Sequence, residues 1–314
     1  MTSQSSQSVV LNNGFGVLFV ILNSFGLGLR LEVGKILGEA FAHRKLAAWA
    51  LVTNFVAIPL LFVGYLLTIA SSIPGEIKVG FCVAALCAGM PFAPLLARVA
   101  KADVSISTTL LVVLTVATIV ALPIGLPIAI DAVDAQLKTS AWDVAWPLLL
   151  FLLLPVVLGC GFRVLWPDLT PPLAQWVVRV AILCLLFNLN FTLVAYWDLF
   201  KEEWGSESYI AALAGPFIGL GCGYLLVSSL RVKDVGIRHA AEATTAVRNI
   251  APMLLMMIYP FAADPLVTVS ITILNTVGIT IVLLFVLMWR RAASWSDTHA
   301  TANQPASLPP PTAT

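Results

Sequence analysis

The chain has very little charge for its length. Asp, Glu, Lys and Arg together make up 11% of its 314 residues, whereas 60% are hydrophobic. A soluble globular domain carries about 25% charged residues, so this chain lacks the charge to cover an aqueous surface. Its net charge of +1 also provides no basic surface for nucleic acid. The composition therefore predicts a membrane protein whose partners include the lipid bilayer but no nucleic acid.

The sequence also lacks the residue groupings of metal centres and catalytic sites. Its five cysteines have no Cys-x-x-Cys spacing and lie inside apolar runs, which indicates core packing. The three histidines lie in connectors or in the tail, without ligand spacing. The apolar runs hold no His-Glu-x-x-His motif, no aspartate pair and no Ser–His combination. We expect no metal, no cofactor and no catalytic residue, and we predict that the protein is not an enzyme.

Nine apolar segments are each long enough to cross a bilayer, which takes roughly 20 residues. Their expected limits are 10–31, 45–70, 75–101, 103–130, 141–166, 172–197, 207–230, 235–261 and 264–291. Residues 1–9 are polar at their start, lack the basic region of a signal peptide, and are expected to form a tail outside the cytoplasm. Residues 10–292 are expected to form the transmembrane domain. Residues 293–314, which are rich in Ser, Thr, Ala and Pro, are expected to be a disordered cytoplasmic tail.

Positive charges fall on alternate connectors between these segments. One set of connectors holds twelve Lys and Arg residues, and the other set holds three, Lys78, Lys138 and Lys201. The positive-inside rule places the first set in the cytoplasm. We therefore expect a multi-pass protein of the cytoplasmic membrane, with its N-terminus outside and its C-terminus in the cytoplasm.

Two of the nine segments contain residues that break a helix or are costly inside a bilayer. Near its middle, segment 75–101 holds two prolines and a glycine, and segment 235–261 holds an arginine and a proline near its middle. These residues are Gly89, Pro91, Pro94, Arg248 and Pro252. Irregular backbone at membrane depth survives only where protein buries it or where it lines a wet cavity. Since broken helices often form a transporter's binding site, we predict such a site here; prolines that only kink ordinary spans are the alternative.

Four motifs together resemble the bile acid:sodium symporter family. Phe25-Gly-Leu-Gly-Leu29 matches the family's F-G-M-G-L, and Asn54-Phe-Val-Ala-Ile-Pro59 matches its Q-F-x-x-x-P. The run from Cys87 to Ser107 follows its first broken helix and the start of the next span, and Thr244 to Asn249 lies on its E-x-G-x-Q-N signature. The resemblance extends from Phe15 to Arg291 and is that of a divergent, bacterial-type member.

This resemblance implies a fold and a mechanism. The fold is an all-α polytopic protein of nine transmembrane helices, built as the family's inverted repeat with its first helix missing and with two broken, crossing helices. A panel domain would comprise residues 10–31 and 141–197, and a core domain residues 45–130 and 207–291. The core would move against the panel to give alternating access.

The chain departs from the family at the positions of the sodium ligands. An oxygen-bearing residue of the family is replaced, position by position, at Ala93, Pro94, Leu111, Thr244 and Arg248; Arg248 takes the place of a glutamine, and Thr244 that of a glutamate. Asn54 and Ser107 keep an oxygen. A hard cation needs several converging oxygens, and an arginine repels it. The usual sodium sites of the family are therefore not expected to operate here.

Arg248 is the residue on which the functional prediction depends. An intramembrane arginine is costly and normally marks a substrate or ion path. Its guanidinium either supplies a fixed positive charge and a planar fork for an anion, or forms a structural pair with Glu242 or with carbonyls freed by the break. Glu242 in turn is either paired with Arg238 one turn earlier or a carboxylate that couples transport to protons.

The sequence thus predicts a secondary active transporter of a small organic anion, acting by symport and alternating access. The expected substrate-binding residues are Arg248, Asn249, Thr244, Thr245, Pro91, Ala93 and Asn275. Residues that could couple transport to a cation or proton are Glu242, Asn54 and Ser107. Asn23 and Ser24 are weaker candidates for the cleft between panel and core. The alternatives are a sodium-coupled symporter of the bile-acid type with rearranged ligands and, in another class, an intramembrane enzyme or receptor. The sequence does not indicate an oligomeric state.

Overall fold

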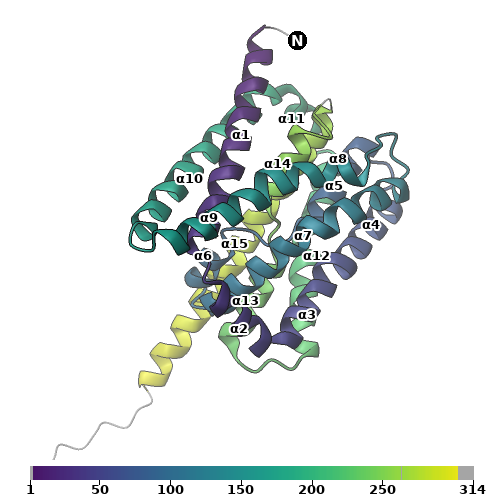
Figure 1. Cartoon of the computed structure of the whole chain (residues 1–314). Helices are drawn as coiled ribbons and strands as arrows, with labels where there is room; N and C mark the ends of the chain where they lie inside the picture. The colour runs from purple at the N-terminus through teal and green to yellow at the C-terminus, as the bar shows by residue number, and fades with distance from the viewer. Residues whose placement is uncertain (1–2, 263, 303–314) are drawn as a thin grey trace, which may run out of the picture.

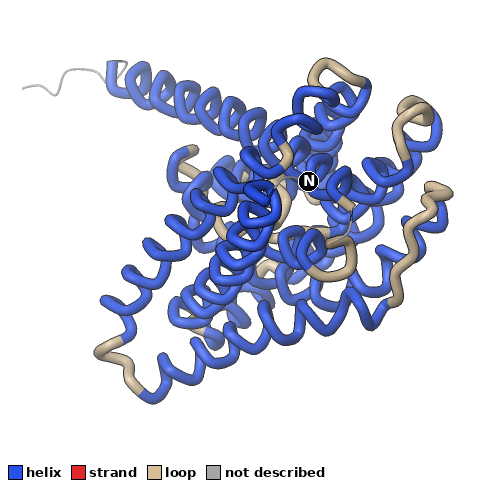
Figure 2. The backbone as a smooth tube through the Cα atoms, turned by 90° about the horizontal axis from the view of Figure 1, so that it is seen from above, coloured by secondary structure: helices blue, strands red, loops and turns tan. Residues whose placement is uncertain are grey.

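The structure is a computed structural model that describes residues 3–262 and 264–302. All secondary structure in this part of the chain is helical, with no strand (Figure 2), as expected of an all-α protein. The elements are α1 (Ser3–Arg30), α2 (Val33–Ala42), α3 (Arg44–Val52), η1 (Thr53–Ala57), α4 (Ile58–Thr68), α5 (Gly75–Leu86), α6 (Ala93–Val99), α7 (Val104–Ala132), α8 (Ala141–Pro147), η2 (Leu148–Leu153), α9 (Leu154–Leu165), α10 (Thr170–Ala195), α11 (Trp197–Glu203), α12 (Glu207–Ser229), α13 (Val235–Ala246), α14 (Ile250–Ile258) and α15 (Pro265–Ala302).

Seven helical stretches among the described residues are long and apolar enough to cross a membrane. Two of them run through a π-helical turn, η1 or η2, without stopping. The seven stretches are Gln7–Arg30, Arg44–Thr68, Val104–Ala132, Ala141–Leu165, Thr170–Ala195, Glu207–Ser229 and Pro265–Ala292. They coincide with seven of the nine predicted segments, and they confirm the expectation of a polytopic membrane protein.

The other two predicted segments are interrupted, at the residues where a break was expected. In the first segment α5 ends at Leu86 and α6 begins at Ala93. In the second, α13 ends at Ala246 and α14 begins at Ile250. The first break contains Gly89 with φ of 79°, a conformation that glycine adopts without steric cost.

The helices pack as two groups (Figure 1). In one group α1 runs along α10 and α9. In the other, α12 packs against α13 and α15, and α5 packs against α15 and α7. We call the first group the α1–α9–α10 layer and the second the broken-helix group.

Two glycines explain how closely the helices of the α1–α9–α10 layer approach. A Cβ added at Gly28 of α1 would collide with the Val156 carbonyl, and one at Gly159 of α9 would collide with the Phe25 carbonyl. The Gly28 Cβ would also lie 3.0 Å from the Gly159 Cα. Small residues let backbones approach in this way inside a membrane, where burial of apolar surface gives little drive for helix association.

The connectors with many basic residues meet at one end of the bundle. Arg163, in the last turn of α9, pairs with Glu32, after α1, at 2.8 Å. The Asp103 N–H, before α7, donates to the Gly236 carbonyl at the start of α13, at 3.1 Å. At the opposite end Ser72 donates to Glu207. We call the end with Arg163 and Asp103 the basic end, and the end with Ser72 and Glu207 the acidic end. The connectors rich in basic residues and those poor in them thus lie at different ends, as the alternation of charge along the chain predicts.

Helix α2 lies wholly outside the predicted spans, and helix α11 lies almost wholly outside them. Helix α2 follows α1, and its apolar residues Val33, Leu37 and Phe41 are spaced four apart and exposed. That spacing is the signal of an amphipathic helix, although no helix was predicted there. Helix α1 begins at Ser3, inside the expected tail 1–9.

The expected disordered tail at residues 293–314 needs a correction. Helix α15 continues past residue 292 to Ala302, because no proline or glycine interrupts residues 293–302. The remaining part of that expected tail, residues 303–314, lies outside the described residues.

The contact between Gly28 and Gly159 gives a first prediction. The substitution Gly28→Ala would force α1 and α9 apart, and we expect it to destabilise the protein by about 1–3 kcal/mol, as overpacking does. The measurement is the melting temperature of the purified protein in detergent. Gly14→Ala is the matched control in α1, because nothing lies within 4 Å of the added Cβ. A Gly28→Ala variant as stable as Gly14→Ala would contradict the packing described here.

Candidate functional site

The two interrupted segments meet at their breaks. The backbone N–H of Asn249, in the second break, donates to the carbonyl of Cys87, in the first, at 2.9 Å. The Asn249 side chain accepts from the Ala251 N–H at 3.1 Å and so caps the start of α14. One residue therefore joins the two breaks and begins the helix that follows.

Threonines of α7 satisfy the backbone of the first break. The Thr118 hydroxyl accepts from the Ala88 N–H at 3.2 Å, and its single proton lies between the Ala88 carbonyl at 3.2 Å and the Leu114 carbonyl at 2.9 Å. The Thr115 hydroxyl donates to the Gly89 carbonyl at 3.1 Å. Buried backbone groups without partners cost free energy, so these hydroxyls make an interrupted helix tolerable at this depth.

Arg248 is held by oxygen atoms from three elements. Its guanidinium donates to the Thr245 carbonyl, to the Ala85 carbonyl at 3.3 Å and to Oδ1 of Asn54 at 3.1 Å. Thr245 and Ala85 lie in the last turns of α13 and α5, just before the two breaks. These are carbonyls freed by the breaks, as one of our two interpretations of Arg248 expected. Within the described residues Arg248 has no ion pair.

Asn54 is oriented for this contact by its own helix. Its Nδ2 donates to the Ala50 carbonyl at 2.9 Å, which leaves Oδ1 free to accept from Arg248. Asn54 lies in the π-helical turn η1 and is fully buried. All three acceptors of the guanidinium are therefore neutral oxygens, the type of ligand that also suits a hard metal cation.

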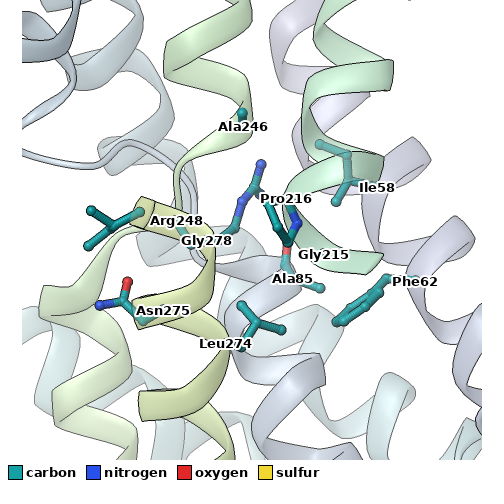
Figure 3. A pocket seen from close by; sticks show the side chains of 11 residues that line it. Ile58, Phe62, Ala85, Gly215, Pro216, Ala246, Arg248, Leu274, Asn275 and Gly278 are labelled. Atoms are coloured by element: carbon teal, nitrogen blue, oxygen red, sulfur yellow. The ribbon is translucent and has the colours of Figure 1, made fainter. Parts of the chain in front are cut away.

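The cavity beside Arg248 is small (Figure 3). It is lined by Arg248 and by residues of α4, α12 and α15, among them Phe62, Pro216, Leu274 and Asn275. Its volume is about 20 Å³, room for about one water molecule. An organic anion does not fit there in this conformation.

The other predicted coupling residues lie apart from Arg248's oxygens. The Ser107 and Thr244 hydroxyls are 2.9 Å apart, and Thr244 also donates to the Ala240 carbonyl at 2.7 Å. Glu242 is 6% exposed and has neither a hydrogen bond nor an ion pair to any residue that the structure describes. Arg238 does not pair with it, and lies instead over the Tyr224 ring, 5.9 Å from its centre.

The predicted substrate-binding residues do not form one pocket. Arg248 and Asn275 line the small cavity, and Pro91 lines a separate, larger cleft. Ala93 is fully buried in an apolar cluster, and the Thr245 hydroxyl is buried without a partner among the described residues.

The larger cleft lies between the α1–α9–α10 layer and the first break. Its volume is about 420 Å³, within the range of about 300–1,000 Å³ typical of ligand pockets. Of the two weaker candidates in α1, Asn23 lines it, whereas Ser24 is buried and does not. Arg30 and Arg98 line it as well. In the sequence both arginines indicated only topology, although each lies near the end of an apolar segment, in the last turn of α1 or α6.

Glycines of α12 were also missed, although their spacing is a known signal. Gly215, Gly219 and Gly223 follow one another at intervals of four, the small-x-x-x-small pattern of close helix pairs. A Cβ at Gly219 would lie 2.9 Å from the Ala246 Cα, and one at Gly223 would lie 3.0 Å from the Glu242 Cα. These glycines bring α12 against the half-helix that carries the second break.

The contacts of Arg248 give a second prediction. Arg248→Gln replaces the guanidinium with a neutral amide on a shorter side chain, which cannot reach both the Ala85 and the Thr245 carbonyl. We expect a loss of about 2–4 kcal/mol of stability from unsatisfied buried groups. Asn54→Ala removes one acceptor and should cost less. Melting temperatures of both variants, with Gly221→Ala in α12 as control because nothing lies within 4 Å of its Cβ, test this. An Arg248→Gln variant as stable as the control would contradict the structural role.

Comparison with known proteins supports the resemblance seen in the sequence. The model of the family described as "Sodium Bile acid symporter family" matches residues 17–202. This match covers the first break and ends before the second, so Thr244 and Arg248 lie outside it. None of the curated proteins searched matches the chain. Because the match extends over more than half of the chain, the protein belongs to the sodium bile acid symporter family, a family of membrane transporters.

Proposed function

We propose that the protein is a secondary active transporter of a small organic anion, in which Arg248 replaces the cation that the family binds near the crossover of its broken helices. One observation carries this proposal: the guanidinium is surrounded by neutral oxygens from both breaks and from Asn54. A fixed charge in this position makes a bound sodium ion unnecessary. No carboxylate within the described part of the chain neutralises it.

A buried, uncompensated positive charge favours an anion nearby. In the low dielectric of a protein interior its field extends further than in water. The guanidinium N–H groups already donate to protein oxygens in this conformation. We therefore propose that Arg248 acts on the substrate anion through its electric field and not through direct hydrogen bonds. The remaining proposed substrate-binding residues are Asn249, Thr244, Thr245, Pro91, Ala93 and Asn275, those closest in sequence to the breaks or, for Asn275, beside Arg248.

For the architecture, we propose that α5–α6 and α13–α14 cross the membrane as broken spans, which gives nine spans in an inverted repeat. The bond between Asn249 and Cys87 supports a crossing at the breaks. The α1–α9–α10 layer would act as the panel and the broken-helix group as the core. The basic end would face the cytoplasm, with the N-terminus outside, in accordance with the charge of the connectors.

Contacts at the two ends support alternating access. Toward the acidic end, the Tyr259 ring at the end of α14 packs on Trp146 of α8 at 4.8 Å and on Phe151 of η2 at 5.2 Å, between ring centres. Toward the basic end Arg30 and Arg98 both line the large cleft. A carrier closed at the acidic end and open at the basic end has this arrangement.

The aromatic contact gives a third prediction. Tyr259→Ala removes both ring contacts, and we expect it to weaken closure at the acidic end and to lower uptake several-fold. Tyr259→Phe is the control, because it keeps the ring and loses only the hydroxyl. The measurement is initial uptake into proteoliposomes at equal protein density. Equal uptake by the alanine and phenylalanine variants would show that the contact does not serve as a gate.

The transport proposal is tested in proteoliposomes with a panel of labelled carboxylates. We expect uptake by the wild type to be unchanged when sodium is replaced by potassium. Arg248→Gln should lower uptake by about tenfold or more, the effect of losing a buried charge. Full uptake by Arg248→Gln at every substrate concentration, or no transport of any carboxylate, would refute the proposal.

A sodium-coupled symporter with rearranged ligands is the second candidate, and the description of the family favours it. It requires uptake that depends on a sodium gradient, which the exchange for potassium measures directly. Proton coupling through Glu242, which is buried and unpaired among the described residues, is distinguished by an imposed pH gradient. If that gradient drives the wild type and not Glu242→Gln, the carboxylate couples transport to protons.

A further inference from the structure

We infer that Arg30 and Arg98 form a charge-selecting pair that binds the anionic group of the substrate across the large cleft, away from Arg248. This inference rests on the proposed function, and it names the residues that read the charge of the substrate. The two arginines line the cleft from helices of the two groups, since α1 packs with α9 and α10 and α6 packs with α7 and α13. Arg30 is the last residue of α1, and Arg98 lies in the last turn of α6, just beyond the first break.

Both guanidinium groups lack a carboxylate partner in the part of the chain that the structure describes. The carboxylate nearest to Arg30 in sequence, that of Glu32, pairs with Arg163 at 2.8 Å. Arg163 also donates to the Leu29 carbonyl at 3.2 Å, so its charge and donors are satisfied outside this cleft. Lys35 lines an adjoining cavity with Arg30 and adds positive charge. The cleft therefore has a positive end with unused donors.

The rest of the cleft suits an apolar body. Leu27 and Ile182 line it from the α1–α9–α10 layer, and Phe92 and Leu95 line it from the first break and α6. Asn23 and Thr108 are its uncharged polar residues. A volume of about 420 Å³ accepts a molecule with a compact hydrocarbon body and one anionic head. A neutral molecule of the same shape would leave the two arginines without a counter-charge.

Repulsion between the two arginines would also affect the transport cycle. Closing the cleft brings Arg30 of one group toward Arg98 of the other. Like charges repel more strongly as they approach and lose water. A bound anion removes this repulsion and accepts hydrogen bonds from both forks. The empty carrier is thus hindered from closing at its basic end, and the loaded carrier is not.

Binding of matched acids and amides to the full-length protein in nanodiscs of uncharged lipid tests this inference. The probes are benzoate and benzamide, cyclohexanecarboxylate and cyclohexanecarboxamide, and naphthoate and naphthamide. We expect the wild type to prefer at least one acid over its amide, with an affinity that falls as the salt concentration rises. Arg30→Gln and Arg98→Gln should each weaken binding of that acid by about tenfold or more, with amide binding unchanged.

Arg44→Gln is the matched control, because it removes a positive charge from an exposed position at the start of α3 and outside the cleft. Arg30→Lys and Arg98→Lys keep the positive charge but lack the planar guanidinium, and they should retain part of the preference for the acid over the amide. Partial retention would show that the glutamine variants lose binding and not their fold. Equal binding of acids and amides by the wild type, a preference that survives both glutamine substitutions, or an equal loss in Arg44→Gln would overturn the inference. Charge-selective binding without uptake in proteoliposomes would instead refute the transport proposal and leave this site standing.

Discussion

Two helices stop and restart inside this bundle, and each stop leaves backbone groups without helical partners. Water cannot satisfy these groups at membrane depth, so side chains and the other break must do so. Arg248 binds the last-turn carbonyls of both half-helices, and Thr115 and Thr118 bind the backbone of the first break. The Asn249 N–H joins the breaks directly. The interrupted helices depend on this network, and so does the position of every group near it.

The same network leaves the charge of Arg248 without a paired carboxylate among the described residues. Arg248 donates only to neutral oxygens, in contrast to Arg163, whose charge Glu32 compensates. Toward the basic end, Arg30 and Arg98 add positive charge in a cleft that also reaches Pro91 of the first break. An anion entering the cleft would thus meet positive charge at the mouth and a positive field from the crossover. This distribution suits the proposed carrier of anions.

Close backbone packing decides which helices can move together. Gly28 and Gly159 fix α1 against α9, and Gly219 and Gly223 fix α12 against α13. In both places a methyl group would collide with or crowd the opposing backbone. Contacts of this kind favour rigid groups of helices, because close-packed interiors do not deform continuously. The large cleft runs between the two groups, where motion would encounter least resistance.

The membrane class, the long spans and both breaks could be predicted from the sequence, because they depend on local properties. Hydropathy over some twenty residues decides whether a helix can cross a bilayer, and Pro91 and Pro94 remove helical hydrogen bonds wherever the chain lies. The alternation of basic connectors follows from the same count of segments. The end of α15 was misjudged, because composition alone does not show where a helix stops.

The partners of Arg248 were decided only by the tertiary structure. Asn54 and Ala85 lie 194 and 163 residues from it along the chain, and nothing in the sequence indicates that η1 and α5 meet the second break. The sequence left Glu242 and the freed carbonyls as alternatives, and only packing could decide between them, because several oxygens lie within reach of a long, flexible side chain. The cleft lined by Arg30 and Arg98 was likewise decided only by the tertiary structure. Each arginine is an ordinary basic residue at a helix end until the fold brings the two helices to one cavity.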